Sequence, residues 1–178
     1  MLIDNDNCLL PSFSGVIYNL AKDFKWKIDV GCCECTHTRQ FKDNIIYLDI
    51  QNQPKAPNPF IKMDARYLWN YFRKGSFDCV LALDFIEHLD KKDGFRFLYN
   101  CFPWDVKRLI IFSPEGEFCV NENAGPDGHR CGWTAEEFEQ MGFQVWLVPK
   151  FHNPKNGAFL AWKTFDGPEY PIDNIKFE

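Results

Sequence analysis

The sequence predicts an α/β domain with three layers, α/β/α, around a mostly parallel seven-stranded sheet whose last strand is antiparallel. Short apolar runs alternate along the chain with segments of helical periodicity, the arrangement that joins parallel strands by crossovers. Several runs are apolar on both faces, as expected for strands that helices cover on both sides. The 178 residues, 46% of them hydrophobic, suffice for one domain with a substantial core, to which we assign residues 1–178.

Seven apolar runs are the predicted strands. The last two are joined by "PKFHNPKNG", whose Asn, Pro and Gly content is typical of a hairpin, so the final strand should run antiparallel. The predicted strands cover residues 26–30, 45–49, 60–63, 77–83, 108–113, 143–148 and 158–162.

Three segments between these strands are predicted helices. Aromatic residues at helical spacing indicate helices over 65–73 and 91–102, and most of these aromatics should belong to the core. A third helix, over 134–141, opens with a capping box formed by Thr134 and Glu137. Residues 50–59 contain three prolines and should form a loop, because proline lacks an N–H donor and clashes inside a helix.

Composition narrows the class of protein. No run of about 18 or more apolar residues is present, and the start "MLIDNDN" is acidic where a secretory signal is basic, so we expect a cytoplasmic protein without a membrane span. The eight cysteines are then expected to be free thiols. The net charge of −5 and the scattered Lys and Arg residues argue against a nucleic-acid partner.

Acidic residues stand near the carboxyl ends of the first four predicted strands, at Asp29, Asp49, Asp64 and Asp84. Ligands of open parallel sheets bind beyond this edge. An acidic edge suits a ligand with hydroxyls, an amine and a positive charge, and repels a pyrophosphate. An aspartate at a strand end is also a common helix cap or turn former, so both interpretations stay open.

The segment "DVGCCECTHT" (29–38) has the place of a nucleotide-binding loop, but Gly31 is its only glycine. A dinucleotide fingerprint needs G-x-G-x-x-G, and a P-loop needs G-K-[ST], so both fit poorly. Cβ atoms make positive φ costly, so Cys33 and Cys35 predict a loop that differs locally from the glycine form or leaves less room.

Two Cys/His clusters raise the question of a metal ion. They lack the paired C-x₂₋₄-C spacing of structural zinc sites, so we expect no metal ion at either of them. The clusters are Cys32, Cys33, Cys35 and His37, and Cys119, His129 and Cys131.

These pieces together resemble the class I S-adenosylmethionine-dependent methyltransferases, from about Trp26 to Lys163. "IDVGCCEC" is similar to the loop after their first strand, and "FDCVLALDFIEHLDKKDG" (77–94) to their fourth-strand segment. "LIIFSPEG" (109–116) with "GHRCGWTAEEFEQMGFQV" (128–145) is similar to the fifth strand, substrate-side loop and last helix of small bacterial and phage-type members. The resemblance implies one Rossmann-like class I methyltransferase domain.

The resemblance also implies S-adenosylmethionine as cofactor. Gly31 would supply the turn, Asp49 would accept hydrogen bonds from the ribose hydroxyls, Asp64 would bind the adenine amino group, and Asp84 would lie near the methionine end. This cofactor carries no phosphate, so its loop needs no row of amides around an anion. The implied cofactor-binding residues are Asp29, Gly31, Cys33, Asp49, Asp64, Ala65 and Asp84.

The implied reaction is direct displacement at the sulfonium methyl group. Positioning alone is worth up to about 7–11 kcal/mol, so a dedicated base is optional. The candidate catalytic residues are Glu87 and His88, just after the fourth strand, and His129, in a loop that could cover the acceptor. For His88 the alternative is a histidine satisfied in the first turn of a helix.

The acceptor follows mainly by elimination. "DFIE" stands after the fourth strand where amino-methylating DNA enzymes of the family carry N/D-P-P-Y/F/W, and no Pro-Cys nucleophile of the cytosine-C5 kind is present. A small molecule or a saccharide, methylated on oxygen or nitrogen, is the leading acceptor. A non-catalytic binding module with this fold and a nucleotide-dependent oxidoreductase are the alternatives.

Overall fold

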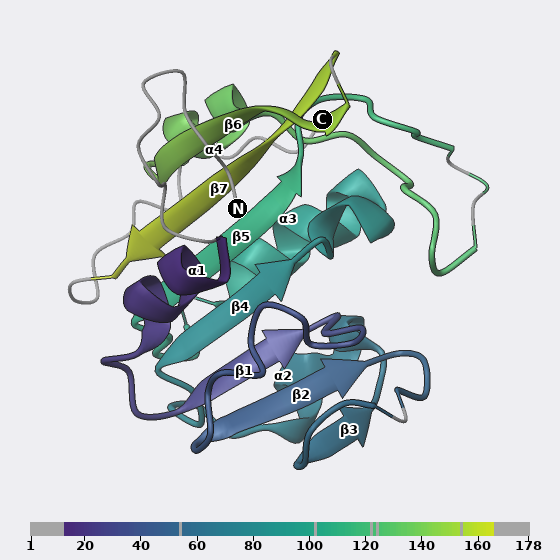
Figure 1. The fold of residues 1–178 in the computed structure, drawn as a ribbon. Helices are drawn as coiled ribbons and strands as arrows, with labels where there is room; N and C mark the ends of the chain where they lie inside the picture. The colour runs from purple at the N-terminus through teal and green to yellow at the C-terminus, as the bar shows by residue number, and fades with distance from the viewer. Residues whose placement is uncertain are drawn as a thin grey trace.

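The computed structural model describes residues 13–165, except 54, 102, 122, 124 and 154. Its described strands form one seven-stranded sheet in the order β3-β2-β1-β4-β5-β7-β6 (Figure 1). Strand β7 is antiparallel to β5 and β6, whereas β1 to β5 pair in parallel with one another. The predicted sheet and its antiparallel last strand are confirmed.

All seven predicted strands are present, with small shifts at their ends. Strands β6 and β7 are longer than predicted because their pairing continues to the hairpin, where Asn153 stands opposite Asn156. The strands are β1 Lys27–Val30, β2 Ile45–Asp49, β3 Phe60–Lys62, β4 Cys79–Leu83, β5 Arg108–Pro114, β6 Gln144–Asn153 and β7 Asn156–Thr164.

The helices agree less well with the sequence patterns. The described α-helices are α1 Phe13–Ala21, α2 Leu68–Tyr71, α3 Lys91–Asn100 and α4 Ala135–Gln140, and the 3₁₀ turns are η1 Ala65–Tyr67 and η2 Ile86–His88. The single helix predicted over 65–73 is wrong. Asp64 caps a 3₁₀ turn by accepting from the Arg66 N–H, and Tyr67 then leaves the α region before a one-turn helix begins.

Two helix ends show how local sequence acts. The predicted capping box of α4 is confirmed, because Thr134 accepts from the Glu137 N–H and the Glu137 side chain accepts from the Thr134 N–H. Helix α1 was not predicted, although its buried residues Phe13, Ile17 and Ala21 recur at a spacing of four. That spacing is the signal that could have identified it.

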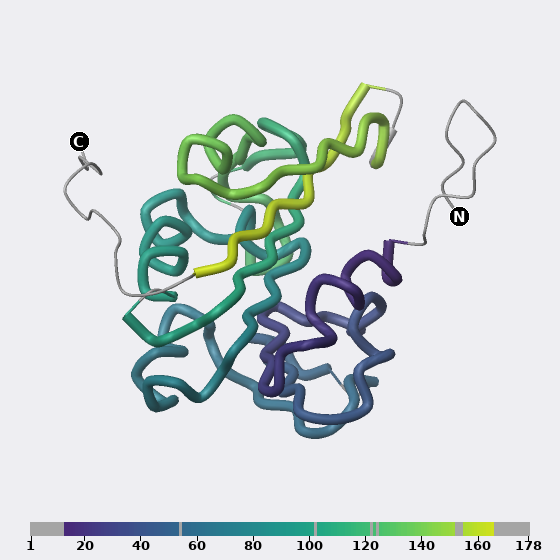
Figure 2. Tube along the Cα trace, turned by 90° about the vertical axis from the view of Figure 1, so that its left-hand side faces the viewer, coloured from purple at the N-terminus to yellow at the C-terminus, as the bar shows by residue number. Residues whose placement is uncertain are grey.

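Helices cover both faces of the sheet, which confirms the three layers. Seen from the side in Figure 2, α1 lies on one side of the sheet and α3 and α4 on the other. Along β4 the side chains alternate accordingly: Leu81 packs in the cluster with α1, whereas Val80 and Ala82 pack with the other helices. Among the described helices none is long and apolar enough to cross a membrane.

The connections at the carboxyl ends of the parallel strands form one edge of the molecule. The crossover predicted as a loop has neither helix nor strand at its described residues 50–53 and 55–59. The long connection from β5 to α4 arcs out on the side to which the parallel strands point (Figure 1). Every residue proposed from the sequence for binding or catalysis therefore lies in or near this edge.

Candidate functional site

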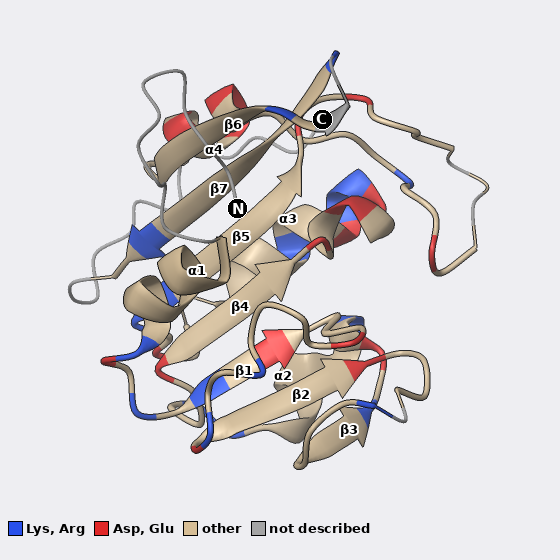
Figure 3. Ribbon diagram, in the orientation of Figure 1, with Lys and Arg blue, Asp and Glu red and all other residues tan. Residues whose placement is uncertain are grey.

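A cavity of about 660 Å³ opens at the carboxyl ends of β1, β2 and β4, a volume within the usual range for small-molecule sites. Carboxylates gather at this edge, as the red strand ends in Figure 3 show. The predicted residues that line the cavity are Asp29, Gly31, Cys33, Asp49, Asp64, Ala65, Asp84 and His88.

Gly31 makes the sharp turn that leaves β1, and its N–H donates to the Leu48 carbonyl at 2.8 Å. Its φ of +67° is a left-handed value that disfavours other residues. A Cβ atom here would lie 2.5 Å from the Phe85 side chain. Glycine is therefore required for two independent reasons, backbone conformation and close packing.

The two cysteines that follow adopt the conformation of glycines. Cys33 has φ +46° and Cys35 has φ +57°. Of the two outcomes expected for this loop, a backbone unlike that of glycine is not found at Cys33 and Cys35, and less room in the loop stays a prediction. Hydrogen bonds hold this conformation, because the Cys33 N–H donates to Asp49 Oδ2 at 2.9 Å and the Cys35 N–H to the Cys32 carbonyl at 2.7 Å.

The three cysteines of this loop differ in exposure, and Cys33 is the exposed one. Cys32 and Cys35 are buried, and each thiol donates to the Cys33 carbonyl at 3.7 Å. The hydrogen bond with Cys35 and burial raise the pKa of Cys32 far above its usual range, which favours the neutral thiol. The seven described cysteines are free, and His37 lies 3.1 Å from the Ser14 hydroxyl through Nδ1.

Asp49 organises the loop as well as facing the cavity. Its Oδ2 accepts from Cys33, and its Oδ1 accepts from the Gln51 N–H at 2.8 Å. Asp29 is buried behind it and accepts from the Thr38 hydroxyl at 2.5 Å. Burial, opposed by the Thr38 hydrogen bond and assisted by the charge of Asp49, raises the pKa of Asp29 to about 7.

Asp64 is tied to a neighbour in the structure. Its carboxylate accepts from the Arg66 guanidinium at 2.6 to 3.1 Å and from the Arg66 N–H at 2.9 Å. These hydrogen bonds hold the pKa of Asp64 below its usual range. Its role toward an adenine amino group stays a prediction, as does that of the adjacent Ala65, which begins η1.

The other half of the edge, after β4, carries a second group of polar residues. Asp84 has φ +51°, and burial raises its pKa to about 6 despite the nearby His129. The 3₁₀ turn η2 then places Glu87 and His88 beside it. Glu87 is 2% exposed, and burial together with the charge of Asp84 raises its pKa to about 8.

The structure brings Glu87, His88 and His129 together, although His129 lies 41 positions after His88 in the chain. One ligand atom from each lies within 4.8 Å of the others, and this is the group of metal-ligating side chains found among the described residues. The two imidazole rings are 5.1 Å apart and nearly perpendicular. The three candidate catalytic residues therefore form one cluster.

Backbone carbonyls fix how both rings are oriented. Nδ1 of His88 lies 3.1 Å from the Gly128 carbonyl, and Nδ1 of His129 lies 2.7 Å from the Phe118 carbonyl. A carbonyl only accepts, so each Nδ1 carries the hydrogen and each Nε2 presents a lone pair. Histidines that bind metal ions are usually oriented by such a hydrogen bond from the ring nitrogen that does not bind the metal.

Ser113, on β5, completes the cluster and was not identified from the sequence. Its hydroxyl donates to Glu87 Oε2 at 3.1 Å, whereas Glu87 Oε1 has no partner among the described residues. A buried oxygen without a partner is costly and marks a position where a ligand is expected. No local pattern could have identified Ser113, since serines in strands are common and only the sheet places it beside Glu87.

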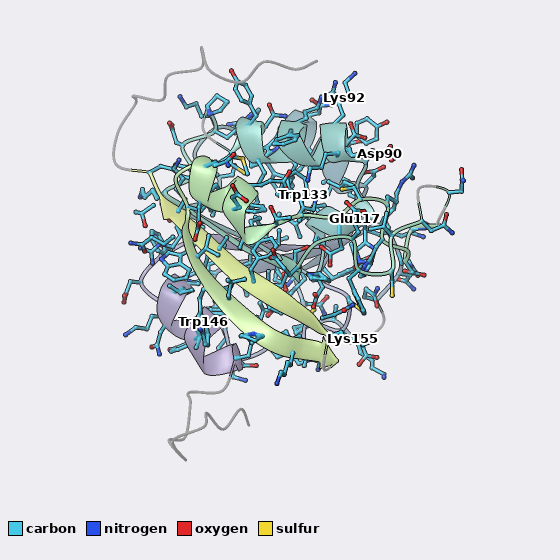
Figure 4. The ribbon with its side chains drawn as sticks, turned by 90° about the horizontal axis from the view of Figure 1, so that it is seen from above. Asp90, Lys92, Glu117, Trp133, Trp146 and Lys155 are labelled. Atoms are coloured by element: carbon cyan, nitrogen blue, oxygen red, sulfur yellow. The ribbon has the colours of Figure 1, made fainter. Side chains whose placement is uncertain are left out.

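Trp133 belongs to the core beside this region. It is fully buried between α3 and α4, with ring contacts to Phe95 at 5.0 Å and Phe138 at 5.6 Å (Figure 4). Its Nε1 donates to the Ile86 carbonyl at 3.3 Å, which anchors η2. Trp133 therefore has a packing role.

Comparison with known proteins identifies the fold. No known family model matches the chain, and neither does any curated protein sequence. Solved structures do match, although all three cited below are at most 20% identical in sequence.

The methyltransferase domain of bacterial CtHen1 is 20% identical, with 85% of this chain and 97% of that chain covered and a TM-score of 0.60. A SAM-dependent methyltransferase from Archaeoglobus fulgidus is 18% identical, with coverages of 83% and 90% and a TM-score of 0.63. The 1,6-didemethyltoxoflavin-N1-methyltransferase of Burkholderia thailandensis, solved with S-adenosylhomocysteine, is 14% identical, with coverages of 86% and 76% and a TM-score of 0.62. The chain has the fold of the class I S-adenosylmethionine-dependent methyltransferases.

Proposed function

We propose that this protein is an S-adenosylmethionine-dependent methyltransferase that methylates a hydroxyl-bearing small molecule or saccharide. A divalent cation held by Glu87, His88 and His129 would position the acceptor. The observation that carries the proposal is a carboxyl and imidazole cluster at the carboxyl edge of a methyltransferase fold, in which His88 also lines the cavity.

The cavity suits the cofactor chemically. S-adenosylmethionine offers ribose hydroxyls, an amino group and a sulfonium cation, all of which an acidic edge can bind. Gly31 makes the sharp turn that leaves β1, and Asp49 lies on the loop beside it with lone pairs left after its two backbone hydrogen bonds. The neighbour from Burkholderia was solved with the corresponding product, S-adenosylhomocysteine, which supports this choice.

The cluster suits a divalent cation by its donor set. Two imidazole nitrogens and one carboxylate oxygen are ligands of catalytic metal ions such as zinc, and they also suit manganese and iron. Glu87 Oε1 lacks a partner, and both rings are held from behind by carbonyls. A bound cation would make an acceptor hydroxyl more acidic, which is the role a separate base would otherwise have.

A second acceptor class has its own support. Among the matching structures are a "small RNA methyltransferase HEN1" and a Pnkp1/Rnl/Hen1 RNA repair complex. The ribose at the end of an RNA chain presents neighbouring hydroxyls that a cation could bind together. The net charge of −5 and the acidic edge speak against a long phosphate backbone, so we rank an RNA terminus after a small molecule or saccharide.

Ligand binding tests the cofactor first. Calorimetric titration with S-adenosylhomocysteine should show binding, and Asp49→Asn should weaken it by about 1–3 kcal/mol because the hydroxyl partners lose a charged acceptor. Asp43→Asn, at an exposed position, is the matched control. NAD should not bind, and NAD binding without S-adenosylhomocysteine binding would favour the oxidoreductase.

Methyl transfer tests the acceptor. Labelled S-adenosylmethionine is incubated with saccharides, small hydroxylated metabolites and short RNAs, with and without added Mn²⁺. Transfer that needs the cation supports the proposal, and the labelled acceptor distinguishes its two versions. Binding of S-adenosylhomocysteine with no transfer to any acceptor would favour a binding module.

A further inference from the structure

The segment 125–130 connects the two halves of the site. It lies along the cavity, which Asp127 and Arg130 line from one side and Gln51 from the other. The Gln51 side-chain amide donates to Asp127 Oδ1 across this opening. Segments that are 76 positions apart in sequence are thereby joined over the cavity.

The same segment is fastened to the metal-ligating cluster. His129 is one of the three candidate ligands, and the preceding Gly128 carbonyl accepts from Nδ1 of His88. The Arg130 N–H donates to the Glu87 carbonyl at 2.7 Å, and Arg130 Nε donates to Asp90 at 2.9 Å. Three successive residues, Gly128 to Arg130, thus contact or belong to the cluster.

On the other side the connection reaches the cofactor loop. Gln51 donates its backbone N–H to Asp49 Oδ1, and Asp49 Oδ2 accepts from Cys33. His129 is therefore connected to Asp49 by the chain back to Asp127, the hydrogen bond from Gln51 to Asp127 and the hydrogen bond from Gln51 to Asp49.

We propose that residues 125–130 form a lid that closes over the cofactor cavity, with the Gln51–Asp127 hydrogen bond as its latch, and that cation binding favours the closed lid. This inference rests on the proposed function, because it concerns the cation and cofactor of that site. A cation bound by Glu87 and His88 would fix His129, and with it Asp127, so that the lid opens less often. Cofactor and cation should then each bind more tightly in the presence of the other, by the same factor.

Titration calorimetry measures this coupling directly. S-adenosylhomocysteine is titrated into the purified chain after dialysis against chelator, and into the same protein saturated with Mn²⁺. Manganese is the probe because it prefers oxygen and nitrogen ligands to the many thiols of this chain. Affinity should rise about 5- to 10-fold with Mn²⁺, within the ordinary range of such couplings.

Variants of the latch separate it from general effects. Gln51→Ala and Asp127→Ala should reduce the coupling factor to about 1 while both ligands still bind. Asp127→Asn keeps the accepting oxygen and should retain the coupling, which excludes a pure charge effect. Asp105 is an exposed acid at the opposite edge of the sheet, and Asp105→Ala should leave both affinities and the coupling factor unchanged. Hydrogen exchange at the Arg130 amide should slow when both ligands are bound.

The outcomes distinguish failure of the lid from failure of the proposed function. If both ligands bind but independently, the lid is refuted and the proposed function stands. If coupling persists in Gln51→Ala and Asp127→Ala, the latch is refuted. If S-adenosylhomocysteine or Mn²⁺ does not bind the wild-type chain, the proposed function fails and the lid fails with it.

Discussion

The two halves of the carboxyl edge differ in whether their acidic side chains have partners within the protein. After β1, β2 and β3, the carboxylates are paired within the protein: Asp29 with Thr38, Asp49 with two backbone amides and Asp64 with Arg66. After β4, Glu87 keeps an oxygen without a partner among the described residues, where no Lys or Arg side chain lowers its pKa or that of Asp84.

This difference teaches what each half is built to bind. Acids that already have partners can shape a loop and still accept further hydrogen bonds from a ligand with hydroxyls. Buried acids without a cation are held partly protonated, as the raised pKa of Glu87 and Asp84 shows, and a cation supplied from outside would restore their charge. Under the proposed function, the first half would hold the cofactor, and the second would bind a cation.

The largest expected effect comes from removing the charge of Glu87, the buried acid after β4. Glu87→Gln removes the anionic oxygen but keeps its shape and the Ser113 contact, so the free energy of unfolding should stay the same or rise. Methyl transfer with Mn²⁺ should fall at least about 100-fold, because the ligand set of the cation is broken. Affinity for S-adenosylhomocysteine without Mn²⁺ should be unchanged.

Glu117→Gln is the control for that variant, since Glu117 is an exposed glutamate on the β5–α4 connection that also carries His129. A Glu87→Gln protein with full activity would contradict the cation site and leave Glu87 as a structural residue only.

The next effect concerns the turn of the first half. Gly31→Ala should lower the free energy of unfolding by about 3 kcal/mol, because it adds both a left-handed alanine and a collision with Phe85. Gly75→Ala has the same strain, with φ +75°, but open space around its Cβ, and should cost only about 1 kcal/mol. Urea unfolding measures both, and equal costs would show that the approach of Phe85 is unimportant.

The buried acid of the first half predicts a pH dependence. The pKa of Asp29 is raised to about 7 in the folded protein from 3.8, so folding takes up a proton between these values. This group therefore makes the folded protein less stable as pH rises from about 4 to about 7, with a slope of at most about 1.4 kcal/mol per pH unit.

Asp29→Asn should remove that part of the slope, whereas the exposed Asp43→Asn should not. Unfolding by urea at several pH values between 4 and 8 is the measurement. An unchanged slope in Asp29→Asn would mean that Asp29 ionises in the folded protein as readily as in the unfolded chain.

The smallest effect distinguishes the cysteine loop from other strained positions. Cys33→Gly relieves a left-handed residue but adds backbone freedom, so stability should change by less than about 1 kcal/mol. S-adenosylhomocysteine should bind as well as before or more tightly. Cys119→Gly, with φ +55° outside the cavity, should have the same small effect on stability and none on binding. Binding abolished by Cys33→Gly alone would indicate a thiol-dependent site.

Much of the fold could be predicted because it depends on local patterns. Apolar runs such as that of β4 must be buried on both faces, and the Thr134–Glu137 capping box fixes the start of α4 with backbone groups a few residues away. The same patterns placed the acids at the strand ends. The helix over 65–73 failed because the Asp64 cap competes locally with an α-helix, and spacing of aromatics does not report such a cap.

The sequence by itself determined which chemical groups stand at the end of each strand, since strand order along the chain and residue type are local properties. Only the tertiary structure decided which of them meet. His129 reaches Glu87 and His88 because hydrogen bonds of the β5–α4 connection, such as that from Arg130 to the Glu87 carbonyl, fold it back over η2. Ser113 joins them because β4 and β5 are neighbours in the sheet. Contacts between residues 26 to 43 positions apart depend on how the elements pack, and no periodicity of the sequence encodes them.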